Sequence, residues 1–364
     1  MKHTTKLLCG LLAAVMLMSV LLTGCTLPKP TLPGVGDVAA TYGDQEISTG
    51  EYLAYLYMNF NNIYQNYYYY AQYGMDPWDQ VAKYGEEGTD LKLADYITAT
   101  TKDSISRIVA LEKMMKDNDL KWLEEDEESV DEELATMEPD AFIDFGFNND
   151  NFTKVYKSMM LTEYSTFMGL YGEGGVNEVK ESEIKKYFKE NYLSYKMITV
   201  SLTDSEGKAL SAKDKQKKLD ELEGYLKIYN EKGFEKAMDA YNKATATEGT
   251  EVEASKDEEN RNDMDATELD AATAKAIRSV KVGEAKIVEY GGEDKKNPTT
   301  ASLIVRLDIN KPASLYKDSK EAILFSLKHE EFDKEVDKVM DTITVEFNEK
   351  VIKKCDPKAF AEEG

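Results

Sequence analysis

Histidine is almost missing from this chain of 364 residues, in which only His3 and His329 occur. His3 belongs to an N-terminal segment that we expect to be removed, so the mature chain would keep one histidine. A single histidine excludes a multi-histidine zinc site and leaves a serine-histidine-aspartate arrangement with only one choice of base. His329 is flanked by charged residues in a helical pattern, and we expect it to be solvated. The sequence therefore predicts neither a metal nor a cofactor.

Basic residues are also scarce. Lysine and arginine together number 45 against 69 aspartates and glutamates, which gives a formal net charge of −24. This excess of negative charge argues against nucleic acid as a partner and against polybasic docking to anionic lipid. The run 124–133 is almost wholly acidic, but it lacks the alternating ligands and turn glycine of a calcium loop. We predict a solvated helix face there.

Long apolar runs are confined to the N-terminus, where Lys2 and Lys6 lead into mostly apolar residues 7–22. A helix of roughly 16 residues rises only about 24 Å, which is short for a hydrocarbon core of about 30 Å. The run ends in Leu-Thr-Gly-Cys at 22–25, which resembles the bacterial lipoprotein signal. That resemblance implies cleavage after residue 24 and lipid on Cys25; a simple secretory signal with a chance cysteine is the alternative. We therefore expect an extracytoplasmic protein, lipid-anchored to the bacterial cell membrane.

The mature chain would then have 340 residues (364 minus 24), enough for two or three domains. Residues 25–36 are rich in proline and glycine, which predicts an extended tether. Cys9 leaves with the signal and Cys25 carries lipid, so Cys355 has no partner for an intrachain disulfide. We expect Cys355 to be a passive residue; a free reactive thiol is the alternative.

The first half of the mature chain is predicted to be helical. Ser48 and Glu51 fit a capping box, and apolar residues follow at helical spacing up to Tyr67. Further helices are expected over 91–118 and 151–170. Tyrosine combines a flat apolar face with one hydrogen-bonding tip, which suits contact with extended peptides. The tyrosine-rich faces of the first helix therefore offer peptide-binding candidates, unless these rings pack against neighbouring helices of the same domain: Tyr55, Tyr69 and Tyr73.

The second half shows the order β-α-α-(loop)-α-β-β, with strands at 195–202 (YKMITVSL), Ala285–Tyr290 and 301–309 (ASLIVRLDI). Thr245 to Asp265 is polar and predicts a flexible insertion. This order, with GFEKAMDAY at 233–241 and VGE at 282–284, resembles a parvulin-type prolyl isomerase domain. The segments 37–56 and 180–200 resemble the corresponding parts of bacterial extracytoplasmic foldases of the PrsA and SurA type.

The resemblance implies an active site that this chain does not reproduce. Active parvulins usually carry one histidine in the first strand and one in the last, where this chain has Met197 and Ser302-Leu303. An X-Pro bond rotates over a barrier of about 18–20 kcal/mol, so an isomerase must favour the twisted amide with oriented polar groups. We predict an isomerase fold with little or no activity and no catalytic residue. Three apolar residues remain as peptide-binding candidates, although Met197 as plain core is the alternative: Met197, Met264 and Leu303.

The resemblance implies an α+β fold. Residues 37–178 would form a mostly helical chaperone domain, 179–310 an inserted parvulin-like domain (β-α-α-α-β-β), and 311–352 a helix and strand that complete the first domain, followed by a tail at 353–364. We predict that Val38–Tyr42 pairs with 343–347, and that the helices form a tyrosine-lined hollow.

Three functions are compatible with this reading. The first is a foldase or chaperone that binds unfolded or newly secreted polypeptides, with a homodimer left open. The others are a solute-binding lipoprotein of a transporter, which requires alternating βα units around a cleft, and a non-catalytic scaffold in envelope assembly.

Overall fold

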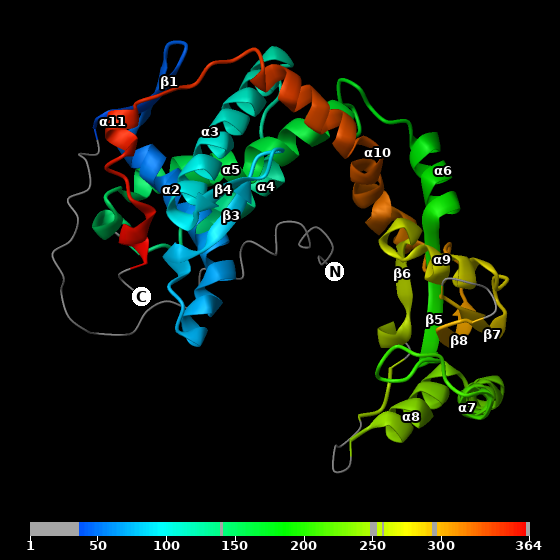
Figure 1. Ribbon diagram of the computed structural model, residues 1–364. Helices are drawn as coiled ribbons and strands as arrows, with labels where there is room; N and C mark the ends of the chain where they lie inside the picture. The colour runs from blue at the N-terminus through cyan, green and yellow to red at the C-terminus, as the bar shows by residue number, and fades with distance from the viewer. Residues whose placement is uncertain (1–35, 139–140, 248–252, 257, 293–296, 362–364) are drawn as a thin grey trace. The chain divides into compact units, whose positions relative to one another are not determined.

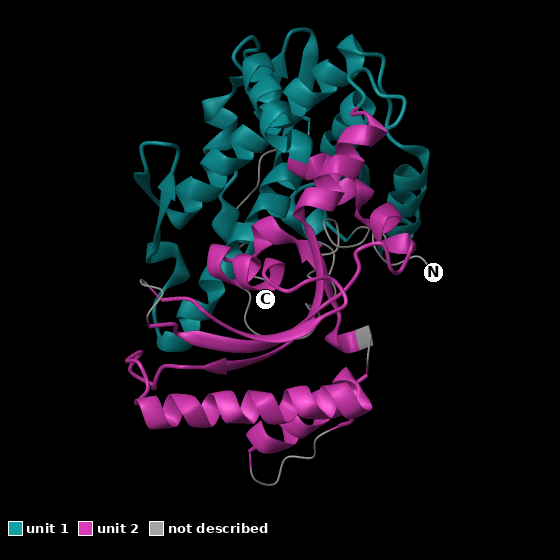
Figure 2. Cartoon of the chain, turned by 90° about the vertical axis from the view of Figure 1, so that its right-hand side faces the viewer, with its two compact units in different colours: residues 1–178, 327–364 teal, residues 179–326 magenta. Residues whose placement is uncertain are grey.

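The computed structural model describes residues 36–361 except 139–140, 248–252, 257 and 293–296. The expected signal segment, the tether and Cys25 lie outside the described residues. The fold combines helices and sheets, and the chain divides into two compact units (Figure 2). Unit 1 comprises Met1–Glu178 and Leu327–Gly364, and unit 2 comprises Val179–Ser326.

The core of unit 1 is built from three helices that pack pairwise: α2 (Thr49–Tyr68), α3 (Leu93–Asp117) and α5 (Asn149–Tyr171) (Figure 1). Each helix buries one apolar stripe, represented by Leu56, Ile105 and Leu161, whose side chains are at most 2% exposed. Such stripes recur at a period of 3.6 residues and need a neighbouring helix to exclude water. The acidic α4 (Glu124–Leu134) lies against α5 with Val130 buried, and most of its carboxylates are exposed, which confirms the predicted solvated face.

Both ends of unit 1 meet in a three-stranded sheet of order β2-β1-β9. The strands are β1 (Val38–Tyr42), β2 (Gln45–Ser48) and β9 (Glu346–Phe347). Ala40 pairs with Phe347 in an antiparallel ladder, which confirms the predicted pairing of the two chain ends. The strand β9 is shorter than the predicted 343–347.

The described part of the expected tail at 353–364 packs against the core. It follows α11 (Glu349–Ile352) and contains η6 (Pro357–Phe360), which contacts α2 and α3. The Phe360 ring lies 5.5 Å from Tyr57 and 5.6 Å from Phe60. Cys355 is 2% exposed, and burial raises the pKa of its thiol to about 12. A thiol that stays protonated is a poor nucleophile.

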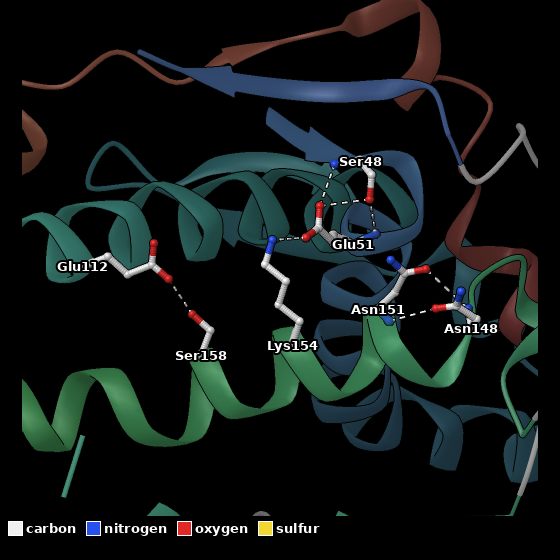
Figure 3. A network of polar contacts seen from close by, with 7 residues as sticks. All are labelled: Ser48, Glu51, Glu112, Asn148, Asn151, Lys154 and Ser158. Carbon is white, nitrogen blue, oxygen red and sulfur yellow. Dashed lines mark hydrogen bonds and ion pairs between the residues drawn. The ribbon is translucent and has the colours of Figure 1, made fainter. Parts of the chain in front are cut away.

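A polar network fixes the start of α2 against α5 (Figure 3). The Ser48 backbone N–H donates to Glu51 at 2.7 Å, and the Glu51 N–H donates to Ser48 Oγ at 3.2 Å, which confirms the predicted capping box. The Lys154 ammonium pairs with the same carboxylate. Desolvation alone raises the pKa of Glu51, but the hydrogen bonds from Lys154 and Ser48 outweigh it and the pKa lies below its usual range.

Unit 2 contains a four-stranded sheet of order β6-β5-β8-β7. Its strands are β5 (Tyr192–Ser201), β6 (Asn262–Asp265), β7 (Ala285–Tyr290) and β8 (Thr300–Arg306), and every pairing is antiparallel. One face packs against α7 (Ala212–Lys232) and α8 (Phe234–Thr245), and the other against α9 (Ala271–Arg278).

The predicted flexible insertion over 245–265 is wrong at its C-terminal end. Residues 262–265 form β6, in which Leu193 pairs with Met264 and Tyr192 with Asp265. The sequence Asn-Asp-Met-Asp has low strand propensity, so its pairing with β5 is what makes it a strand. The sheet consequently has one strand more than the predicted order.

Two further helices belong wholly or partly to unit 2. They are α6 (Glu181–Asn191) and α10 (Ser314–Met340), and α10 crosses the division between the units at Ser326–Leu327. The first half of α10 packs on α6, where Tyr316 lies 5.2 Å from Phe188 and Lys320 pairs with Glu181 at 2.7 Å. The expected division at residue 311 therefore differs from the structure. Among the described residues, no helix is long and apolar enough to cross a membrane.

Candidate functional site

The C-terminal end of α2 and the following turn expose a run of tyrosines. Tyr69 is 48% exposed and Tyr73 is 70% exposed, and their ring centroids are 5.5 Å apart. Tyr70 lies 4.7 Å from Tyr69 and 6.1 Å from Tyr67. Tyr69 and Tyr73, two of the predicted peptide-binding candidates, are thus brought together on the surface.

The local sequence explains why these rings stay exposed. The α-helix tightens into η1 (Tyr69–Tyr73) and stops at Gly74, which has a φ of +71°, a value that glycine adopts without strain. η2 (Pro77–Asp79) follows, and its Trp78 ring stacks on Tyr64 at 5.0 Å and on Phe60 at 6.1 Å. These contacts, in which Phe60 is buried and Tyr64 and Trp78 are half-buried, anchor the turn that carries the exposed rings.

Beside this run, half-buried tyrosines lie on the hairpin of β3 (Val81–Tyr84) and β4 (Thr89–Lys92), which carries Tyr84, and on α3, which carries Tyr96. Burial raises the pKa of the Tyr67 hydroxyl, and the nearby Tyr96 and Tyr70 raise it further. Tyr96 in turn lies edge-on to Tyr84 at 6.4 Å. We call these residues together the tyrosine track: Tyr67, Tyr69, Tyr70, Tyr73, Tyr84 and Tyr96.

A cavity of about 500 Å³ lies at the Tyr84 end of the track. One wall is a face of α3, and the opposite walls come from the β3–β4 hairpin and from Phe347 of β9. Its lining is mixed in polarity: Tyr84, Leu91, Asp95, Thr98, Ala99, Lys102, Asp103, Ser106 and Phe347.

Tyr55, the third tyrosine candidate, does not belong to this surface. It is 7% exposed, and burial raises the pKa of its hydroxyl, with the Ser158 hydroxyl as a hydrogen-bond partner. Its ring therefore packs inside the domain, as the alternative reading allowed. The cavity beside Tyr84 is lined by none of the three candidate tyrosines, and the tyrosine-lined hollow stays a prediction.

In unit 2, the α9-side face of the sheet carries a chain of hydroxyls and sulfurs. The Tyr290 hydroxyl lies 3.0 Å from Ser302 Oγ, which lies 2.9 Å from Thr199 Oγ1. The Tyr290 hydroxyl also lies 3.8 Å from Met197 Sδ. Met197 is partly buried and packs against the core on this face. These internal partners hold the side chains in place.

Met264 and Leu303 occupy different faces of this sheet. Met264 is partly buried on the α9 side, where its Sδ accepts a hydrogen bond from the Tyr195 hydroxyl at 3.3 Å. Leu303 has no exposed surface and belongs to the core beneath α7 and α8. Leu303 as a peptide contact is wrong, because the alternation of a strand turns it away from Met197 and Ser302.

The sequence reasoning missed Tyr84, Tyr96 and the cavity beside them. The sequence between them carries a hairpin pattern that could have been found: two short β-prone runs separated by Gly85-Glu-Glu-Gly88. Both glycines have positive φ, +69° and +63°. That hairpin brings Tyr84 to α3, where Tyr84 donates to Asp103 Oδ1 at 3.1 Å.

Comparison with known proteins finds similar solved structures. No protein-family model and no curated protein sequence matches the chain. The foldase PrsA from Lactococcus lactis is 13% identical over 90% of this chain and 99% of its own, with a TM-score of 0.33. PrsA from Streptococcus pneumoniae is 12% identical over 72% of this chain and 91% of its own, with a TM-score of 0.32.

A third similar structure is the peptidylprolyl isomerase PrsA from Bacillus anthracis, which is 16% identical over 65% of this chain and 94% of its own, with a TM-score of 0.26. At such identities and TM-scores, these similarities do not assign the activity of those proteins to this chain.

Proposed function

We propose that this protein is a lipid-anchored extracytoplasmic chaperone that binds unfolded or newly secreted polypeptides through the tyrosine track of unit 1. The observation that carries the proposal is the exposure of Tyr69 and Tyr73, at 48% and 70%, on an anchored turn. Rings of this kind cover apolar and aromatic segments of many sequences at a low cost in side-chain entropy.

The charge of the chain supports the same role. A formal net charge of −24 keeps a protein with exposed aromatic rings soluble and limits its association with itself. An unfolded client that does not share this large negative charge can approach the rings and contact them. Anchoring through Cys25 is part of the proposal, and loss of incorporated radiolabelled fatty acid in Cys25→Ser would support it.

In this proposal, unit 2 does not catalyse fast prolyl isomerisation. The positions that the parvulin resemblance assigns to histidines hold Met197 and Ser302-Leu303, and the polar atoms of Met197 and Ser302 are engaged by Tyr290 and Thr199. A Ser-Tyr-Thr hydroxyl chain with internal partners offers few groups oriented toward a twisted amide. We expect a proline-containing test peptide to isomerise at its uncatalysed rate, and a rate typical of active parvulins would contradict this part.

The main experiment is suppression of aggregation of a denatured secreted protein by the full chain and by Tyr69→Ala/Tyr73→Ala. Removing two rings should weaken client binding about tenfold, since each aromatic contact contributes about 0.5–1.5 kcal/mol beyond its buried area. Tyr69→Phe/Tyr73→Phe is the matched control, because it keeps the rings and should retain suppression. Unchanged suppression by the alanine variant would contradict the proposal.

The solute-binding alternative finds less support. It requires alternating βα units in two lobes, whereas every strand pairing among the described residues is antiparallel. A thermal-shift screen with small solutes would separate the two functions, since a solute receptor should gain stability with its ligand.

A further inference from the structure

The lining of the cavity at the end of the tyrosine track carries more negative than positive charge. Asp95, Lys102 and Asp103 lie on one face of α3 at helical spacing, and all three line the cavity. Lys102 is committed elsewhere: its Nζ lies 2.6 Å from Glu349 Oε1 and 5.5 Å from the centroid of the Phe347 ring. The charges left to face a ligand are therefore the two carboxylates.

The two carboxylates differ in how they are held. Asp103 accepts a hydrogen bond from the Tyr84 hydroxyl at 3.1 Å, which holds the carboxylate at the hydroxyl end of the aromatic ring. Asp95 is exposed and makes no hydrogen bond or ion pair with another described residue. A ring beside an acidic group is a setting that attracts a cation through both the ring face and the carboxylate.

The size of the cavity fits a side chain and not only a surface ion. About 500 Å³ lies within the range of about 300–1,000 Å³ that small ligands occupy. The apolar parts of Leu91, Ala99 and Phe347 can cover the aliphatic stem of a long side chain, while its charged tip reaches a carboxylate.

We propose that this cavity binds a lysine or arginine side chain of a client whose neighbouring aromatic residues lie along the tyrosine track. This inference rests on the proposed function and narrows its substrate class to extended segments that combine aromatic and basic residues. The occupant follows from charge complementarity, since an anionic side chain would meet two carboxylates and a lysine already paired with Glu349.

The test measures binding of labelled, unstructured peptides to the full chain by fluorescence anisotropy. Three peptides carry the same aromatic residues and differ at one position, which is lysine, norleucine or glutamate. Norleucine keeps the aliphatic stem and removes the charge. We expect the lysine peptide to bind about fivefold more tightly than the norleucine peptide, and the glutamate peptide to bind more weakly than both.

Asp95→Asn/Asp103→Asn should bring the lysine and norleucine affinities together. The matched control is Glu132→Gln/Glu133→Gln, which changes the net charge equally at exposed positions of α4 and should keep the preference. Equal affinities for the three peptides, a preference that survives the asparagine variant, or an equal loss in the glutamine variant would each overturn the inference.

These results separate the inference from the proposed function. If the norleucine peptide binds and aggregation is suppressed but no lysine preference exists, only the inference fails. If none of the peptides binds and aggregation is not suppressed, the proposed function fails and the inference fails with it. The comparison of peptides on the unmodified chain needs no variant, so a misfolded variant does not remove the test.

Discussion

Tyr73 in unit 1 and Tyr290 in unit 2 are both tyrosines at the end of a secondary-structure element, but their surroundings differ. Tyr73 is 70% exposed and touches Tyr69. The Tyr290 hydroxyl lies 3.0 Å from Ser302 Oγ and 3.8 Å from Met197 Sδ, and its ring packs on a buried cluster. The same side chain is available for a client in unit 1 and serves internal packing in unit 2.

The difference follows from what lies beside each ring. In unit 2 the strand partner and α9 surround the sheet face, so a polar tip must find a partner inside. In unit 1 the helix end passes into a turn, and the polar tips can reach water while the ring faces stay open. The proposed contact with clients therefore falls on an element that ends at the surface.

The largest expected effect is a loss of stability on mutation of Leu303, which is fully buried in unit 2. Leu303→Ala should lower the free energy of unfolding of unit 2 by about 3 kcal/mol, because it leaves a cavity in a packed core. Urea unfolding measures this loss, with Val282→Ala as the control, since Val282 is 59% exposed. A decrease in the free energy of unfolding below about 1 kcal/mol would contradict the assignment of Leu303 to the core.

Leu303→Ala also tests whether the two units have separate roles. Aggregation suppression by Leu303→Ala should stay within about twofold of the unmodified chain at temperatures where unit 1 is folded, because client contacts lie in unit 1. A parallel loss of suppression and stability would show that the two units do not divide the roles as described.

A smaller effect is expected in unit 1, at Glu51. Glu51→Gln should cost about 1 kcal/mol at pH 7, because the neutral amide loses the pairing with Lys154 and the charge-assisted bond from Ser48. The pKa of this carboxyl is lowered in the folded protein. Its stabilisation is thus present above the unfolded pKa of about 4.3 and is lost as pH falls through the lower folded pKa.

Chemical denaturation between pH 7 and pH 3 would follow this difference. The gap between the unmodified chain and Glu51→Gln should shrink as the solution becomes more acidic, while the exposed Glu132→Gln should match the unmodified chain throughout. A gap that does not depend on pH would mean that the charge of Glu51 does not stabilise unit 1.

The smallest effect concerns Tyr290. Tyr290→Phe removes one hydroxyl from the chain with Ser302 and Met197, and Ser302 keeps its contact with Thr199. We expect a loss near 0.5–1 kcal/mol in the stability of unit 2 and no change in peptide binding. Weaker peptide binding by this variant would move the client site to the sheet face of unit 2.

Several parts of the fold could be predicted because local patterns and buried stripes agree. The capping box at Ser48, the strand Ala285–Tyr290 and the pairing of β1 with β9 are confirmed. The strand β6 could not be found from its composition, since Asn-Asp-Met-Asp becomes a strand through its pairing with β5. Tertiary packing determines the conformation of such segments, and it cannot be inferred from a short stretch of sequence.

The candidate site shows the same limit. The dense tyrosine pattern made Tyr55, Tyr69 and Tyr73 candidates alike, because all three share one helix and its extension. Packing against neighbouring helices was the alternative for each, so the exposure of Tyr69 and Tyr73 and the burial of Tyr55 could not be told apart from the sequence. The cavity depends on α3, a hairpin and β9, which are more than 200 residues apart in sequence at their extremes. Only the folded chain brings Phe347 to Tyr84.

The most direct test of the account is site-specific photo-cross-linking of a denatured secreted protein. A photoreactive phenylalanine analogue would replace Tyr73 in one protein and Tyr290 in another, with the rest of the chain unchanged. We predict efficient cross-links to the client from position 73 and few from position 290. Cross-links from position 290 with none from position 73 would contradict the account.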